Sequence, residues 1–368
     1  FAFFSQDLMK NETKSQSLQT KITRQIDNSA ANPNIHYVGR FDLSNPKKAN
    51  FAWSGSSIRA RFEGRKCILK FKNHSESNFF AVFIDNVEKP IVLEVNEDQE
   101  LYEVASNLSE GEHDILIFKQ TEARCGVVDF LGFELEKNKK LLPFEQKKQL
   151  KIEFIGNSIT CGYGNEAQAA NEKFKTKTEN HYLSFASLTA RKLNAEHFTI
   201  AYSGKGLVRN YDLSTNQILP KIYPKIYPQS SKDWDFKRWT PDAVVICLGT
   251  NDLANSKIDS VLFVNKYVEF VSQIHANYPE ASIFLLNSPM LVKFKKGKES
   301  KDDFSPRQTL ENYITSTITI LEEKGVKKLH YFAPSQQGKY GYGAMWHPSL
   351  KQHEVTAKEL SEFMVDKL

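Results

Sequence analysis

Cysteine is scarce in this chain, with four among 368 residues. Cys67, Cys125, Cys161 and Cys247 lie far apart, with no C-x-x-C pair and no histidine at the spacing of a zinc site. This pattern excludes a zinc knuckle and a densely disulfide-linked scaffold. We therefore expect no metal site, and the redox compartment stays open.

Long hydrophobic runs and a large excess of one charge are also missing. No uninterrupted apolar stretch approaches the ~20 residues that a membrane helix needs, so we expect no membrane span. Lysine and arginine number 49 against 44 aspartate and glutamate residues. Because a nucleic-acid-binding domain usually gathers basic residues on one face, we expect no nucleic-acid partner.

The composition is that of a folded protein with two domains. Hydrophobic residues make up 40% of the chain and charged residues 25%, which is typical of globular proteins. At roughly 100–200 residues per domain, this length predicts two domains. We expect an N-terminal extension at residues 1–34, a β-sandwich at 35–140 and an α/β domain at 148–368.

The first residues leave two explanations open. Phe1 to Phe4 are apolar, no methionine starts the chain, and polar sequence follows from Ser5. The trimmed apolar part of a signal peptide has this pattern, and an arbitrary start of the sequence would look the same. We expect a secreted or periplasmic protein.

The region from Ile35 to Leu135 has the rhythm of short strands. Apolar residues alternate with polar ones, turn residues recur, and no convincing helical stretch interrupts the series. Such a series is typical of an antiparallel sandwich or jelly roll. Strands are predicted around residues 51–62, 67–72, 78–85, 100–105, 113–119 and 127–135.

From Leu150 onward, strands and helices alternate. This alternation predicts a parallel sheet with helical crossovers, and ligands bind such a sheet at the carboxyl ends of its strands. The predicted strands are 150–155, 197–202, 243–248, 282–286 and 328–332, and the predicted helices are 181–193, 260–277, 307–324 and 348–365.

Polar residues stand at the ends of these strands. Ser158 lies in the turn after the first strand, Gly204 after the second and Asn251 after the third. His347 precedes the last helix. Because the carboxyl ends of parallel strands meet at one edge of a sheet, we expect the four segments to converge there.

These residue types suit nucleophilic catalysis by serine. A serine hydroxyl needs a base to take its proton, and the oxyanion that forms needs preorganised donors. We assign Ser158 as the nucleophile and His347 as the base. The oxyanion hole would consist of the Ser158 and Gly204 amides and the Asn251 side chain, with Gly206 as the alternative to Gly204.

Other polar residues nearby receive structural interpretations. His181 and His353 are expected on helix surfaces, and Asp252 is expected to cap a helix. His347 is also expected to cap the helix that begins at Pro348, because proline suits the first position of a helix.

In the same order, these four residues match the named residues of the SGNH (GDSL-type) hydrolase superfamily, which the chain resembles from about Lys151 to its end. The resemblance implies a flavodoxin-like fold, with a parallel sheet flanked by helices, and the catalytic roles given above. Asn157 stands where the motif usually has aspartate, which is tolerable because that side chain is not the nucleophile.

The whole chain is similar to carbohydrate esterase family 2, in which a jelly-roll domain precedes an SGNH domain. This resemblance implies that the protein removes acetyl groups from plant polysaccharides such as xylan and glucomannan, several members favouring the sugar 6-hydroxyl. It implies no metal and no organic cofactor. The stretches that carry it are Gly39–Asp42, Trp53–Ser56, Thr121–Ala123, Phe130–Phe133, Ser203–Tyr211 and Trp346–Ser349.

One position departs from the superfamily pattern. The third triad residue is an aspartate just before the histidine, but Ala344 and Met345 occupy the candidate positions here. Losing such an aspartate costs ~10⁴ in kcat when the histidine tautomer becomes wrong. We expect a backbone carbonyl to accept the Nδ1 proton of His347, as the resemblance to Ser–His dyad members implies. The alternative is a distant acid such as Asp302 or Asp303.

Aromatic residues near the strand ends are candidate sugar contacts, since sugar sites combine aromatic rings with a few orienting polar groups. Ordinary core packing is the competing interpretation for each of them. The candidates are Trp346, Tyr211, Tyr163, Trp239 and Tyr342.

Two other functions stay open. One is a lipase or thioesterase of the same superfamily. The other is a carbohydrate-binding protein on a degenerate hydrolase scaffold, which the missing aspartate and the aromatic content of 12% favour. The leading prediction is a monomeric acetyl esterase whose partner is an acetylated polysaccharide or oligosaccharide.

Overall fold

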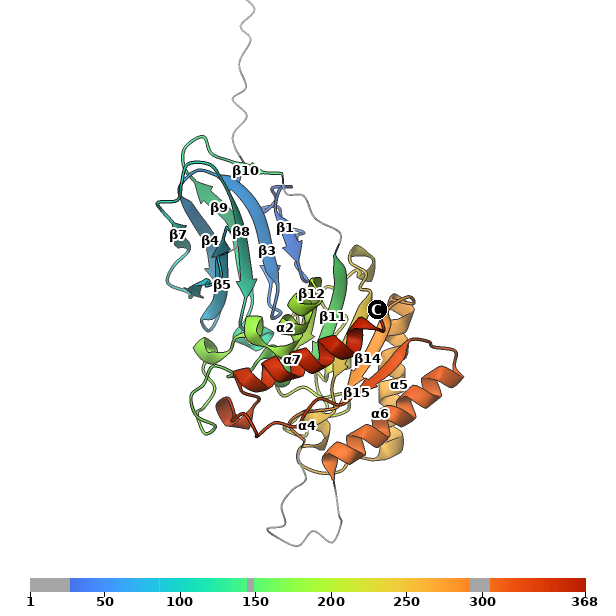
Figure 1. The fold of residues 1–368 in the computed structure, drawn as a ribbon. Helices are drawn as coiled ribbons and strands as arrows, with labels where there is room; N and C mark the ends of the chain where they lie inside the picture. Colours follow the sequence, from blue (N-terminus) through green and yellow to red (C-terminus); the bar gives the residue numbers. More distant parts are fainter. Residues whose placement is uncertain (1–26, 86, 144–148, 292–304) are drawn as a thin grey trace, which may run out of the picture.

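The structure is a computed structural model that describes residues 27–85, 87–143, 149–291 and 305–368. An N-terminal β-rich part lies against a C-terminal α/β part (Figure 1). The apolar start at Phe1 to Phe4 and most of the predicted extension lie outside the described residues. Within those residues, no helix has the length and apolar character needed to cross a membrane.

Two antiparallel sheets form the β-rich part, and phenylalanine dominates the core between them. In the first sheet the order is β1-β3-β8-β5-β6, with β10 on β3. Its strands are β1 (His36–Val38), β3 (Ser57–Glu63), β8 (Glu112–Lys119), β5 (Asn78–Ile84), β6 (Ile91–Val95) and β10 (Leu141–Leu142). The second sheet is β2 (Ala49–Phe51), β9 (Val128–Leu135), β4 (Cys67–Asn73) and β7 (Leu101–Ala105), in that spatial order.

The α/β part contains a parallel sheet in the order β12-β11-β13-β14-β15. This is the flavodoxin-like order, in which the first strand along the chain lies second in the sheet. Two of its strands, β13 and β14, read as nearly continuous apolar runs because helices cover both faces. The five strands are β11 (Leu150–Gly156), β12 (Ala195–Ala201), β13 (Ala243–Cys247), β14 (Ser282–Leu286) and β15 (Leu329–Phe332).

Four helices cover the two faces of this sheet (Figure 1). α2 (Phe185–Lys192) and α7 (Leu350–Val365) pack on one face, while α5 (Ser260–Asn277) and α6 (Pro306–Glu323) pack on the other. The α/β class with a preceding β-sandwich is therefore confirmed. Shorter helical turns are α1 (Ser158–Cys161), α3 (Leu219–Ile222), α4 (Thr250–Leu253), and the 3₁₀ turns η1 (Ala123–Cys125), η2 (Thr176–Thr178), η3 (His181–Leu183), η4 (Phe236–Arg238) and η5 (Ala344–Trp346).

Two predicted helix starts were wrong because serine caps set them. The helix predicted from His181 begins at Phe185, since the Ser184 side chain accepts a hydrogen bond from the Ser187 amide. The helix predicted from Pro348 begins at Leu350, with Ser349 as its cap. His347 is therefore not the capping residue.

The two histidines expected on helix surfaces are buried instead. The ring of His181 stacks on Phe118, and its Nε2 atom lies 2.9 Å from Thr199 Oγ1. The His353 Nδ1 atom accepts a hydrogen bond of 3.0 Å from the Phe185 amide. Both rings also hold the start of α2, His353 through this bond and His181 through its Nδ1 atom, 3.1 Å from Oγ of the capping Ser184.

Buried polar contacts join the two parts of the molecule. The Arg40 guanidinium, from the β-rich part, lies 3.1 Å from Glu153 Oε1 on β11, and both side chains are fully buried. The Trp53 indole donates a hydrogen bond of 2.7 Å to the carbonyl of Ile226. The interface between the parts therefore combines buried polar contacts with apolar packing of Ala52, Trp53 and Ala123 on the α/β part.

Candidate active site

Ser158 lies where β11 gives way to α1. The Asn157 side chain caps this helix by accepting a hydrogen bond of 3.2 Å from the Ile159 amide. Asparagine serves as well as aspartate for this purpose because either offers an acceptor oxygen. Gly162 ends the helix with a φ of 84°. The hydroxyl therefore stands at the carboxyl edge of the sheet, beside helical amides that have no partner within the helix.

His347 reaches Ser158 across the sheet edge. The His347 Nε2 atom lies 2.9 Å from Ser158 Oγ, although the two residues are 189 positions apart in the chain. The distance is within the range of a hydrogen bond through which a proton can move. The predicted proximity is confirmed, and the catalytic roles of the two side chains stay predictions.

The other ring nitrogen of His347 faces the backbone. Nδ1 lies 3.0 Å from the carbonyl oxygen of Ala344. Among the described residues, the histidine–carboxylate pairs are those of His36, His74 and His113. Asp302 and Asp303 lie outside the described residues. A carbonyl acceptor requires the proton to sit on Nδ1, which leaves Nε2 with a lone pair toward Ser158.

The turn that presents this carbonyl is strained. Met345 has a φ of 49° and Trp346 a φ of 57°, a region that costs a non-glycine residue ~1–3 kcal/mol. The amides of residues 344–346 donate to carbonyls of residues 164–172, at 2.9 to 3.1 Å. These bonds stabilise the turn in a conformation that holds the carbonyl against His347.

His347 is neutral at physiological pH. Burial lowers its pKa to about 4, and the positive charge of Arg124 acts in the same direction. Hydrogen bonds to backbone carbonyls oppose this effect. The Tyr163 ring packs on the imidazole with a centroid distance of 4.3 Å. A neutral imidazole beside a hydroxyl is the form that can accept its proton.

The donors expected for an oxyanion lie in the next two loops. Gly204 has a φ of 79°, and its amide donates no hydrogen bond within the described residues. The Gly206 amide donates to Asn210 Oδ1 at 3.3 Å, which makes it the weaker candidate. Asn251, on α4, donates one N–H to the Lys205 carbonyl at 2.7 Å. The second N–H of this side chain is available for a ligand.

Asp252 organises the loop after Gly204, and its predicted role as a helix cap was wrong. Its buried carboxylate accepts hydrogen bonds of 3.0, 2.7 and 3.0 Å from the amides of Leu207, Val208 and Arg209. This role could not be foreseen, because the amides belong to a loop more than forty residues earlier in the chain.

Four of the five aromatic candidates lie near these groups. Trp346 is 55% exposed beside His347, and Tyr211 is 58% exposed with its amide 2.8 Å from the Gly204 carbonyl. Tyr342 is also exposed, and its backbone pairs with Pro348, the residue after His347. Tyr163 is mostly covered and supports the imidazole, so its ring has little surface left for a sugar.

Trp239 is the exception, and its assignment as a substrate contact was wrong. The indole is buried, stacks on Phe198 at 3.8 Å and donates a hydrogen bond of 2.6 Å to Glu196. Glu196 lies near the amino end of β12, whereas Ser158 follows the carboxyl end of β11. The tryptophan therefore packs at the opposite edge of the sheet.

The β-rich part places Arg124 beside the Ser158–His347 pair, and the sequence did not predict this neighbour. Its guanidinium carbon lies 5.6 Å from the centroid of the Tyr163 ring and 4.4 Å from that of Phe174. Arg124 and Phe174 also line a cavity of about 490 Å³. No periodicity or spacing signals a residue that comes from another domain.

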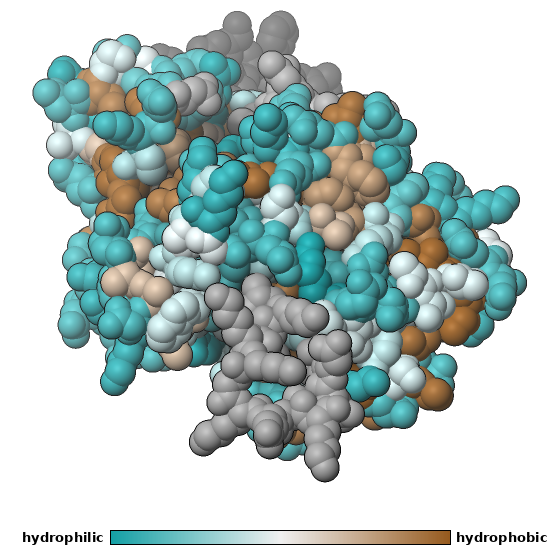
Figure 2. Space-filling view, turned by 60° about the horizontal axis from the view of Figure 1, so that its bottom comes forward, coloured by the Kyte–Doolittle hydropathy of each residue, from teal (hydrophilic) through white to brown (hydrophobic). Residues whose placement is uncertain are grey.

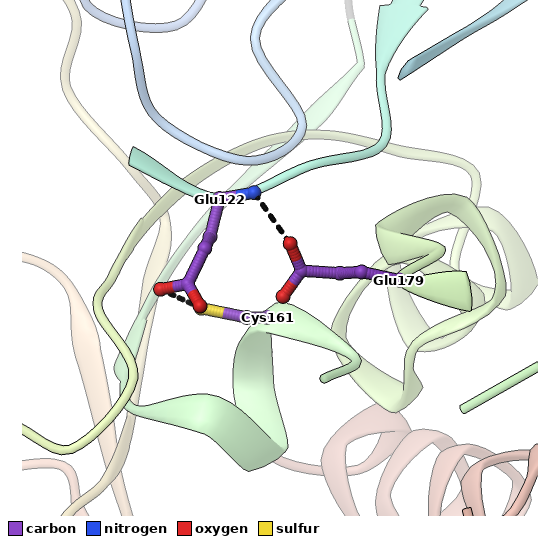
Figure 3. Close-up of side chains that lie close together, drawn as sticks. All are labelled: Glu122, Cys161 and Glu179. Carbon is purple, nitrogen blue, oxygen red and sulfur yellow. Dashed lines mark hydrogen bonds between the residues drawn. The ribbon is translucent and has the colours of Figure 1, made fainter. Parts of the chain in front are cut away.

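One group of buried side chains has the spacing of metal ligands. Ligand atoms of Glu122, Cys161 and Glu179 all lie within 4.8 Å of one another (Figure 3). Burial raises the pKa of the Cys161 thiol and of the Glu179 carboxyl well above their usual values, which favours their protonated forms and opposes metal ligation. Arg124, 3.6 Å from Glu122, supplies the compensating charge. These ligands do not fit a divalent cation, and we assign no metal.

Comparison with protein families gives two matches that divide the chain. The family described as "Carbohydrate esterase 2 N-terminal" matches residues 37–144. The "GDSL-like Lipase/Acylhydrolase family" matches residues 154–355. The first match covers the β-rich part, and the second covers the proposed serine and histidine.

Individual relatives agree with these families. A cellulase/esterase, CelE, of Acetivibrio thermocellus is 38% identical over 92% of this chain, which spans 40% of that protein's length. An acetylxylan esterase / glucomannan deacetylase of Cellvibrio japonicus is 27% identical over 90% of this chain and 88% of its own. A family two carbohydrate esterase from Clostridium thermocellum, solved in complex with cellohexaose, has a TM-score of 0.83 and 37% identity, covering 90% of this chain and 98% of its own.

Proposed function

This chain belongs to carbohydrate esterase family 2, and from that membership we propose that it is a serine esterase that removes O-acetyl groups from plant-type polysaccharides. The observation that carries the proposal is the 2.9 Å contact between Ser158 Oγ and His347 Nε2. Beside this contact lie a neutral imidazole, which can accept a proton, and amide donors for an oxyanion, and acyl transfer by a serine needs both.

In the acylation step, Ser158 Oγ attacks the acetyl carbonyl carbon while His347 Nε2 takes the hydroxyl proton. The carbonyl oxygen becomes an oxyanion, stabilised by the Ser158 and Gly204 amides and by the Asn251 side chain. Collapse of this intermediate breaks the bond to the sugar oxygen. His347 returns the proton to that oxygen, and an acetyl-enzyme remains.

Deacylation repeats the sequence with water. His347 takes a proton from a water molecule, whose oxygen attacks the acetyl carbon of the acetyl-Ser158 ester. The same donors hold the second oxyanion. Its collapse releases acetate, and the proton returns to Ser158. The Ala344 carbonyl accepts the Nδ1 proton of His347 in every step, so the imidazole keeps one orientation and only its Nε2 atom gains and loses a proton.

The proposed substrates are acetylated xylan and glucomannan, with the sugar 6-hydroxyl as the favoured position. Two curated relatives from Cellvibrio japonicus carry these polymers in their names. Trp346 directly precedes His347, Tyr211 is bonded to the Gly204 carbonyl, and both rings are exposed and suit stacking on the apolar faces of sugars. We also propose that the protein acts outside the cytoplasm, where such polymers occur, and as a monomer, because one chain supplies every group of the site.

A lipid ester is a less suitable substrate. Figure 2 brings forward the face toward which the loops after the strands project, and hydrophilic groups cover most of the described surface visible there. The hydrophobic groups visible on it lie toward the upper left and along the right side, with hydrophilic groups between them. A long acyl chain would need a continuous apolar surface.

The decisive test follows individual acetyl signals by NMR while the protein acts on acetylated xylan and on acetylated glucomannan. We expect acetate to appear, with loss of signals from specific hydroxyl positions, and no release by Ser158→Ala, whose circular dichroism should match wild type. Binding of either glycan without acetate release would instead support a carbohydrate-binding function on this scaffold.

A further inference from the structure

A carboxylate from the β-rich part reaches into the proposed active site. Glu122 directly precedes η1, yet its side chain makes no capping bond there. Its Oε2 atom instead accepts a hydrogen bond of 2.8 Å from the amide of Ser203, the residue before Gly204. The side chain is fully buried.

The same oxygen also contacts the helix that bears the nucleophile. The Cys161 thiol points at Glu122 Oε2 with a sulfur–oxygen distance of 3.7 Å (Figure 3). Because burial keeps the thiol protonated, the sulfur is the donor. Cys161 ends the single turn of α1 that Ser158 begins. One oxygen thus links the oxyanion loop and the nucleophile helix.

The backbone of Glu122 is held as firmly as its side chain. Its amide donates a hydrogen bond of 2.8 Å to Glu179 Oε2. Its carbonyl accepts from the buried ammonium of Lys119 at 3.3 Å. Arg124 Nε lies 3.6 Å from Glu122 Oε1 and balances the charge. Because hydrogen bonds and an ion pair hold both the backbone and the side chain of Glu122, its carboxylate can fix the positions of the Ser203 amide and the Cys161 thiol.

We infer that Glu122 is a positioning residue, which fixes the Gly204 amide and Ser158 at the separation that the oxyanion requires. The inference rests on the proposed function. Glu122 itself touches no reacting atom, since its contacts are to Ser203 and Cys161. The β-rich part then contributes directly to the geometry of catalysis, in addition to bracing the α/β part.

The test replaces Glu122 with methionine, which has a similar volume and only a weakly accepting sulfur, and with glutamine, whose carbonyl can still accept from the Ser203 amide. Glu103→Gln is the matched control, because this exposed glutamate of β7 pairs with Lys66 and belongs to neither linked element. The full chain of each variant is assayed in two ways. One is steady-state hydrolysis of 4-nitrophenyl acetate, and the other is the rate at which a fluorophosphonate labels Ser158.

We expect Glu122→Met to lower kcat and the labelling rate by about 10- to 100-fold with little change in KM, since a misplacement of ~1 Å can cost ~10²-fold. Glu122→Gln should recover to within about fivefold of wild type, and Glu103→Gln should match wild type. Rates are expressed per active site titrated by the phosphonate, so partial unfolding does not imitate the effect.

Unchanged labelling and turnover in Glu122→Met would overturn the inference, as would equal losses in Glu122→Met and Glu122→Gln. If the methionine variant does not fold, Glu122→Asp withdraws the carboxylate by one methylene while keeping its charge, and the same loss is expected. The labelling rate needs no acetyl ester. A wild-type chain that labels readily but releases no acetate would therefore refute the proposed function while still testing Glu122.

Discussion

The Nδ1 atom of His347 lies 3.0 Å from the carbonyl oxygen of Ala344, three residues earlier in the same turn. A carbonyl fixes the tautomer of the ring as a carboxylate does, but it lacks the full negative charge that would stabilise the imidazolium. The strained conformation of Met345 and Trp346 gives that carbonyl its direction. A histidine held in this way should be a weaker base than one paired with an acid.

The pH dependence of hydrolysis should show this weaker base. Burial lowers the pKa of His347 to about 4, and only the neutral ring can accept the Ser158 proton. We expect kcat/KM for an acetate ester to stay level as the pH falls from about 8 to 5, and to decline below that with a midpoint near pH 4. Acetate release measured by NMR across this range checks the profile.

Acid unfolding must be separated from this effect. Burial also lowers the pKa of His181 and of His353, each to about 3. Both rings charge more readily in the unfolded chain, so stability falls as the pH drops below ~6.5. Circular dichroism at each pH identifies the folded range. A midpoint near 6.5 in folded protein would contradict the pKa that burial lowers and the weak base that it predicts.

Removing the side-chain donor of the oxyanion hole should lower the rate of chemistry. Asn251→Ala deletes the amide that is bonded to the Lys205 carbonyl on one side. Loss of one such donor costs ~10²–10³ in kcat, and KM should change much less. Steady-state kinetics on 4-nitrophenyl acetate measure both constants.

A second asparagine provides the control for loop disturbance. The Asn255 side chain donates to the Tyr211 carbonyl at 2.9 Å and is exposed. Asn255→Ala should therefore turn over the small ester at the wild-type rate. Equal losses in the two alanine variants would show that Asn251 acts through the loop and not on the oxyanion.

The buried pair of Arg40 and Glu153 should dominate the stability of the interface. Arg40→Met leaves the Glu153 carboxylate without its cation in a fully buried site, which typically costs ~3–5 kcal/mol. Adding Glu153→Gln should recover part of this loss, because the unpaired charge is then gone. Urea unfolding of the single and double variants measures both changes.

The pH dependence of that loss has a defined sign. Burial raises the pKa of Glu153, and Arg40 opposes the shift. Without Arg40 the folded state binds a proton that the unfolded chain releases, so stability should increase as the pH falls. The cost of Arg40→Met should therefore be smaller at pH 5 than at pH 7. An equal cost at both pH values would show that Glu153 keeps its charge.

Sequence patterns were sufficient where a local rule determines the outcome. The apolar runs gave β13 and β14 nearly to the residue, and the polar residues after strands led to Ser158 and His347, because parallel strands place their carboxyl ends together. One local signal was missed, because Ser184 caps α2 and sets its start later than the hydrophobic pattern predicted.

Contacts between distant segments could not be predicted in this way. Asp252 accepts from loop amides that precede it by more than forty residues, and Glu122 reaches Ser203 from another domain. Neither contact leaves a period or a spacing in the sequence. Burial is equally invisible, which is why Trp239 could not be distinguished from an exposed aromatic.

Replacing Trp346 and replacing Trp239 should have different effects on sugar binding. Trp346 is 55% exposed beside His347, whereas Trp239 is buried and bonded to Glu196 at the other edge of the sheet. Stacking on an aromatic ring contributes ~0.5–1.5 kcal/mol, which corresponds to a change of ~2- to 12-fold in affinity. Trp346→Ala should raise KM for an acetylated oligosaccharide by about that factor. Trp239→Phe should leave KM unchanged and lower the free energy of unfolding, because the Glu196 carboxylate loses its indole donor.

Oligosaccharide titrations with Ser158→Ala as the background measure binding without turnover. A loss of affinity in Trp239→Phe but not in Trp346→Ala would place the sugar site away from the Ser158–His347 pair.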